Sequence, residues 1–137
     1  MLFKLGKVYV SISIYFLLMV CWVVITNRLS EFLCCLVALI FHELGHIFMI
    51  YFLKEKISVF YIIPFGFSCR LKNQSRIEQR KLLKILLAGP LTSFTVFGLA
   101  FFYLKDFSVI NLIIGIFNFV PIGCLDGGRI FRILMQS

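Results

Sequence analysis

The chain has 137 residues, of which 61% are hydrophobic and 15% are charged, and its formal net charge is +8. A composition this apolar excludes an ordinary soluble domain and predicts an all-α polytopic membrane protein, with about four spans of roughly 20 residues each. The basic residues gather between the apolar runs, so the charge indicates membrane topology and no nucleic-acid partner. We expect one membrane core over residues 1–137.

The first uncharged run covers residues 8–27 and follows two lysines. It is longer than the apolar core of a signal peptide and offers no small-residue cleavage site, so we interpret it as the first membrane helix. A short connection with one basic and one acidic side chain leads to the second run, residues 32–53. That run is also long enough to cross a bilayer.

The second run carries the H-E-x-x-H pattern in His42, Glu43 and His46, and the chain has no other histidine. Residues four apart lie on one face of a helix, so the two histidines can bind one metal ion. Glu43 can then act beside the metal as a general base. Ionisable groups at bilayer depth are costly, which favours a functional site. The alternative is a histidine pair satisfied by hydrogen bonds between helices.

A hydrophilic connection over residues 54–84 holds eight basic and two acidic side chains, a net charge of +6. The positive-inside rule places this connection in the cytoplasm, together with both termini of a multi-pass protein. Within it, residues 57–71 are rich in β-branched and aromatic side chains and are interrupted by Pro64-Phe65-Gly66. This pattern predicts a short membrane-associated β-hairpin or re-entrant strand pair between the second and third helices.

The third helix is predicted over residues 85–104, and its Ala88-Gly89-Pro90 segment favours close helix packing. In the predicted topology, the helix with the histidines runs from the outside to the cytoplasm. His46 comes late in that helix, so we expect the active site to lie toward the cytoplasmic side.

The fourth apolar run predicts a helix over residues 107–120, followed by a broken segment over residues 121–128. Pro121 should end the helix, because it lacks an N–H group and clashes with the preceding turn. The helix is then about 21 Å long, short of the ~30 Å hydrocarbon core, so the break should lie within the membrane. Gly127 and the following glycine would let the backbone turn closely there.

Asp126 lies in this broken segment and is the candidate third metal ligand. A catalytic zinc site usually has three protein ligands, and the chain lacks a third histidine. The other acidic residues outside the H-E-x-x-H pattern sit at span ends or in polar connections, where a solvated carboxylate is ordinary. The alternative for Asp126 is a simple Asp-Gly turn at the membrane interface.

The H-E-L-G-H run at residues 42–46 and the N-x-x-P-x-x-x-L-D-G-G run at residues 118–128 together resemble the site-2 protease family of intramembrane zinc metalloproteases. Pro64-Phe65-Gly66 and Ala88-Gly89-Pro90-Leu91 are similar to landmarks of its sporulation branch, the stage IV sporulation protein FB-like proteins. The resemblance implies one Zn²⁺ held by His42, His46 and Asp126, with Glu43 as the catalytic acid/base. It also implies that Asn118 contacts the substrate or supports the loop at the metal.

The function implied by this resemblance is regulated intramembrane proteolysis of a membrane-spanning or membrane-tethered protein. The expected partners are that substrate, the lipid bilayer and regulatory membrane proteins. The strand pair at residues 59–71 is expected to hold an unwound substrate segment by β-augmentation. The sporulation branch continues with a cytoplasmic regulatory domain, which we do not expect here because the sequence ends soon after Asp126.

Two other functions are compatible with parts of the pattern. A non-catalytic, protease-like membrane module could use the same residues to hold a partner. A zinc transporter can also carry H-E-x-x-H in a membrane helix, but it would need further ligands and more spans than this chain offers.

Overall fold

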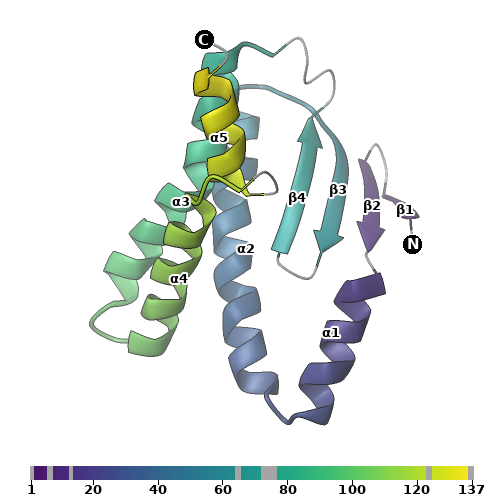
Figure 1. Ribbon diagram of the computed structural model, residues 1–137, viewed down its shortest axis with the longest axis vertical. Coiled ribbons are helices and arrows are strands. Elements are labelled where there is room, and N and C mark those ends of the chain that lie inside the picture. The colour runs from purple at the N-terminus through teal and green to yellow at the C-terminus, as the bar shows by residue number, and fades with distance from the viewer. Residues whose placement is uncertain are drawn as a thin grey trace.

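The computed structural model describes residues 2–5, 8–12, 14–63, 66–71, 77–122 and 125–135. The order of elements along the chain is β1 (Leu2–Leu5), β2 (Val8–Ile12), α1 (Ile14–Ile25), α2 (Leu29–Phe52), β3 (Ile57–Ile63), β4 (Gly66–Leu71), α3 (Gln79–Ala100), α4 (Lys105–Asn118) and α5 (Asp126–Met135). Helix α2 stands at the centre, with α3, α4 and α5 on one side and the sheet and α1 on the other (Figure 1).

Helices α2 and α3 are long and apolar enough to cross a membrane. Both correspond to predicted spans, but each begins several residues earlier than the apolar pattern indicated. In α3 the early residues 79–84 are mostly polar, and they continue the helix beyond its apolar part. Helix α4 has only 14 residues and α1 only 12, so neither reaches the length of an ordinary span.

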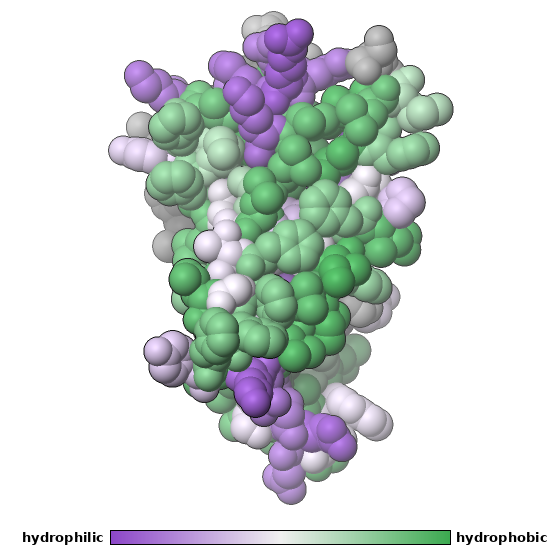
Figure 2. All heavy atoms as spheres, turned by 90° about the vertical axis from the view of Figure 1, so that its left-hand side faces the viewer, coloured by the Kyte–Doolittle hydropathy of each residue, from purple (hydrophilic) through white to green (hydrophobic). Residues whose placement is uncertain are grey.

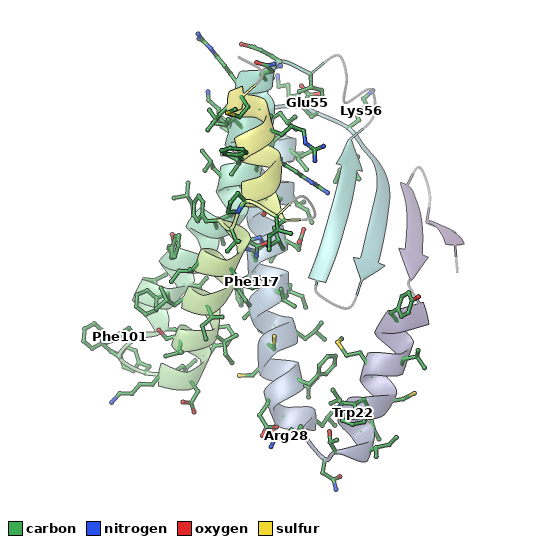
Figure 3. The ribbon with its side chains drawn as sticks, in the orientation of Figure 1. Trp22, Arg28, Glu55, Lys56, Phe101 and Phe117 are labelled. Carbon is green, nitrogen blue, oxygen red and sulfur yellow. The ribbon has the colours of Figure 1, made fainter. Side chains whose placement is uncertain are left out.

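The surface of the helices is apolar over its middle. Seen from the side of α3 and α4, hydrophobic side chains cover the centre and hydrophilic ones gather at both ends (Figure 2). Arg28 lies at one end of α2, and Glu55 and Lys56 lie beyond the other end (Figure 3). A wide exposed apolar surface with polar ends fits a lipid environment, and two of the helices are long and apolar enough to cross a bilayer.

The N-terminal residues correct the prediction of a helix over residues 8–27. Residues Val8–Ile12 form β2, which pairs antiparallel with β1 and parallel with β3. The Val-Tyr-Val-Ser-Ile sequence is rich in β-branched and aromatic residues, which fit a pleated sheet. Apolarity alone does not distinguish such a strand from the start of a membrane helix, and α1 keeps only residues 14–25.

The sheet has four strands in the order β1-β2-β3-β4. The strand pair between α2 and α3 consists of β3 and β4, which run antiparallel. An all-α class is therefore too narrow, because β1 and β2 extend this pair into a mixed sheet. Strand β3 is paired on both sides, so β1 and β4 are the outer strands of the sheet within the described residues. Pro64 and Phe65, which join β3 to β4, lie outside the described residues.

Helices α2 and α3 approach closely at Gly45. A Cβ atom at this position would lie 2.6 Å from the Ala88 carbonyl oxygen and closer still to the Thr92 hydroxyl. Gly45→Ala should therefore force the helices apart and destabilise the fold by about 1–3 kcal/mol, the usual cost of overpacking. Unfolding in detergent measures the effect, and an unchanged midpoint would show that the contact is not tight.

Candidate active site

Three side chains that can bind a metal converge between α2 and α5. Asp126 Oδ2 lies 3.2 Å from His42 Nε2 and 3.0 Å from His46 Nε2, and the two imidazole nitrogens are 3.3 Å apart. Both histidines are buried and Asp126 is half-buried. Ligand atoms at about 2.0–2.1 Å from a tetrahedral zinc are separated by about 3.3 Å. The donor set and its spacing therefore fit one zinc ion.

The two histidines reach this point because they are one helical turn apart. Positions four apart share a face of α2, and this face packs against α3, which contacts both rings (Figure 1). The rings lie nearly perpendicular, with centroids 5.0 Å apart. The helix thus presents two Nε2 atoms to the same space.

Asp126 reaches the site because the chain breaks after α4. Helix α4 ends at Asn118, and a series of tight turns follows, including hydrogen bonds from the Val120 and Leu125 amides. Pro121 lies in this break and is exposed. Asp126 is then the first residue of α5. The break therefore lies between Asn118 and Asp126, so it begins and ends earlier than the predicted segment over residues 121–128. Cys124 within it lies outside the described residues.

Gly127 does not form the predicted turn. It lies in the first turn of α5, which packs against the end of the preceding segment. A Cβ at Gly127 would lie 2.7 Å from the Val120 carbonyl oxygen and closer still to that of Phe119. A glycine is needed here for close backbone approach, and this approach brings Asp126 to the histidines.

The amide of Asn118 donates a hydrogen bond to the Ile114 carbonyl of its own helix, at 3.0 Å. The side chain is half-buried at the last turn of α4. In this structure it closes the end of α4, and a contact with substrate stays a prediction.

Glu43 is buried beside the two histidines, with 9% of its surface exposed. It lies within electrostatic range of His46, Asp126 and Arg129. Arg129 is half-buried, one turn after Asp126 on α5, and its nearness to Glu43 was not predicted. The site therefore has a buried carboxyl group within electrostatic range of two of the three converging side chains and of a guanidinium.

Helix α3 contributes contacts that the sequence did not reveal. His46 Nδ1–H donates to the Ile85 carbonyl oxygen at 2.8 Å, and His42 Nδ1 lies 2.9 Å from the Ser93 hydroxyl. Gly89 lies between these two positions along α3 and directly faces the imidazoles. The only available signal was the spacing of Ile85, Gly89 and Ser93, which are four residues apart and so share one helix face.

The chain is similar to several known proteins. Peptidase family M50 matches residues 101–137. A zinc metalloprotease of Methanocaldococcus jannaschii is 26% identical over 99% of this chain and 45% of its own length. Stage IV sporulation protein FB of Bacillus subtilis is 27% identical over 82% of this chain and 43% of its own length. The chain thus spans less than half the length of the curated relatives it matches.

A solved structure is also similar. The site-2 protease from Methanocaldococcus jannaschii matches with a TM-score of 0.80 and 26% identity, covering 98% of this chain and 70% of that chain. The similarity therefore extends over nearly all of the chain, in both sequence and fold.

Proposed function

We propose that the chain is an intramembrane zinc metalloprotease, on the basis of its similarity in sequence and fold to the site-2 proteases of peptidase family M50. It hydrolyses a peptide bond in or near a membrane-spanning segment of another protein. The observation that carries the proposal is the convergence of Asp126 with His42 and His46, within 3.0–3.3 Å, where the two histidines lie on an apolar helix of membrane length. Glu43, buried beside them, supplies the acid/base group that hydrolysis needs.

In this proposal His42, His46 and Asp126 hold the metal. Bound zinc supplies a Lewis acid that polarises a carbonyl group and brings the pKa of a coordinated water to about 7. Glu43 accepts the proton of the attacking water and delivers it to the leaving amine. Arg129 lies within electrostatic range of Glu43.

The sheet is the proposed place for the substrate backbone. A peptide bond in a membrane helix is shielded by its own hydrogen bonds, so the substrate has to unwind before it is cut. Strand β3 has partners on both sides, so β4 is the strand nearest to α2 whose outer edge has no partner in the part of the chain that the structure describes (Figure 1). An unwound segment pairs with β4 by β-augmentation and so lies beside the helix that carries Glu43. This narrows the predicted edge from residues 59–71 to Gly66–Leu71.

The topology proposed for this protein has both termini and the strand-bearing connection in the cytoplasm. The basic residues of that connection support this topology, because Lys and Arg in short loops favour the cytoplasmic side of a membrane. Lys81 forms an ion pair with Glu55 there, at 3.3 Å. This pair joins the first turn of α3 to the residues that follow α2. The active site then opens toward the cytoplasmic side of a single membrane core that includes all five helices.

Metal content tests this proposal directly. Purified wild-type protein should bind about one zinc per chain, because three ligand atoms face one point. His46→Ala and Asp126→Ala should each lower the affinity strongly, since a three-ligand site loses one ligand in each. Elemental analysis after dialysis against a weak chelator measures this, on protein carrying a tag without histidines.

Cleavage and transport assays then distinguish the alternatives. The wild type in liposomes should cut a single-span substrate and should not carry zinc across the bilayer. Zinc binding without cleavage of any single-span substrate would favour the non-catalytic membrane module. Zinc flux without cleavage would favour a transporter.

A further inference from the structure

Each histidine of the site has a second ring nitrogen, and its partner fixes which nitrogen carries the proton. A neutral imidazole binds a metal through the nitrogen that lacks a proton. His46 Nδ1 faces the Ile85 carbonyl oxygen at 2.8 Å. A carbonyl oxygen only accepts hydrogen bonds, so this contact keeps the proton on Nδ1 and leaves His46 Nε2 free for a ligand bond.

His42 has a different kind of partner. Its Nδ1 lies 2.9 Å from Ser93 Oγ, and this hydroxyl is the hydrogen-bonding group that faces it. Ser93 is 0% exposed and His42 is 2% exposed, so solvent does not reach the contact to replace the hydroxyl. Deleting it would therefore leave a buried N–H group without a partner, which is costly.

The two contacts come from one face of α3. Ile85 and Ser93 are eight residues apart, and Gly89 lies midway between them, so the three positions share one helix face. A Cβ at Gly89 would lie 2.8 Å from His42 Nε2, which shows how closely α3 covers the rings. The backbone of this face orients His46, whereas only a side chain, that of Ser93, orients His42.

We propose that Ser93 is a positioning residue of the metal centre. Its hydroxyl accepts a hydrogen bond from His42 Nδ1–H and so fixes the ring with Nε2 toward His46 and Asp126. This proposal rests on the function proposed above, because it assumes that these three groups bind zinc. Groups that hold a metal-binding histidine in this way typically contribute about 10–100-fold to metal affinity.

Ser93→Ala tests the proposal, with Ser108→Ala as the matched control. Ser108 is also 0% exposed, and its hydroxyl donates to the Phe97 carbonyl at 2.9 Å, so both variants lose one buried serine hydroxyl. Zinc affinity is measured by competition with a chelator at fixed pH. We expect Ser93→Ala to bind zinc about 10–100-fold more weakly than the wild type, and Ser108→Ala to bind it as the wild type does. Ser93→Thr, which keeps the hydroxyl, should lie closer to the wild type than Ser93→Ala.

A spectroscopic readout separates positioning from a general loss of stability. His42 and His46 are the only histidines of the chain, so protein labelled with ¹⁵N-histidine gives signals from just two rings. In zinc-loaded Ser93→Ala, the Nδ1 proton signal of His42 should shift because its acceptor is gone, while that of His46 should stay in place. In Ser108→Ala neither signal should move.

The outcomes are distinguishable. If Ser93→Ala and Ser108→Ala bind zinc equally well and the His42 signal is unmoved, Ser93 does not position the ligand and the proposal is wrong. If the wild type itself binds no zinc, the function proposed above fails first and this proposal fails with it. Weak zinc binding by Ser93→Ala alone, with a shifted His42 signal and an unchanged His46 signal, would support the proposal.

Discussion

Glu43→Gln should lower the rate of substrate cleavage by about 10²–10⁴-fold, the usual contribution of a general acid/base. The amide is nearly the same size as the carboxyl group but does not take up the proton of the attacking water. Glu43 is not one of the three converging ligands, so zinc content should stay at the wild-type value. The measurement is the cleavage rate of a single-span substrate in liposomes, paired with elemental analysis of the same sample.

The pairing of the two measurements decides the role of Glu43. A variant that has lost both zinc and activity would indicate that Glu43 supports the metal site. Cleavage at the wild-type rate with full zinc content would show that another group transfers the proton. Only loss of cleavage with zinc retained assigns the acid/base role to this residue.

Gly89→Ala should weaken zinc binding by about a hundredfold or more, although it adds only one methyl group. The added Cβ would lie 2.5 Å from His46 Cε1 and 2.8 Å from His42 Nε2, so at least one ring has to leave its position. Displacing a group at a reacting centre by about 1 Å can lower a reaction rate a hundredfold, and we expect a loss of similar size in zinc affinity when a ligand ring is displaced. Helix propensity works in the opposite direction, because alanine is favoured over glycine within a helix by roughly 1 kcal/mol.

Gly98→Ala is the control, since Gly98 is in the same helix and a Cβ there meets no atom within 4 Å. It should bind zinc as the wild type does and be no less stable. Chelator competition on both variants measures the difference. Equal zinc affinities would mean that α3 lies farther from the imidazoles than the structure indicates.

The three candidate metal ligands were largely predictable from sequence. The spacing of His42 and His46 requires only the period of a helix, and the break at Pro121 suggested that Asp126 lies at depth. Neither pattern predicts how far α5 lies from α2. The convergence of the three candidate ligand atoms at 3.0–3.3 Å is therefore known only from the structure.

Other features escaped sequence reasoning for identifiable physical reasons. Residues Val8–Ile12 are as apolar as a membrane helix, and their strand conformation depends on a partner, β3, that is distant in sequence. Ser93 is an ordinary small residue in an apolar helix, and its importance depends on which ring it faces. Gly127 suggested a turn by composition, but close packing against the Phe119 and Val120 carbonyls is what requires a glycine there.

The order in which the ligands are synthesised follows from their separation along the chain. Asp126 is made 80 residues after His46, which at about 5–20 residues per second takes ~4–16 s on the ribosome. Helix α3 is made earlier and already provides Ile85 and Ser93 as partners for both imidazoles. The histidines can thus be held in place in the nascent protein before the third ligand exists. The complete ligand set forms only after α5 has been synthesised, so the nascent chain cannot carry out the proposed hydrolysis while its earlier helices are entering the membrane.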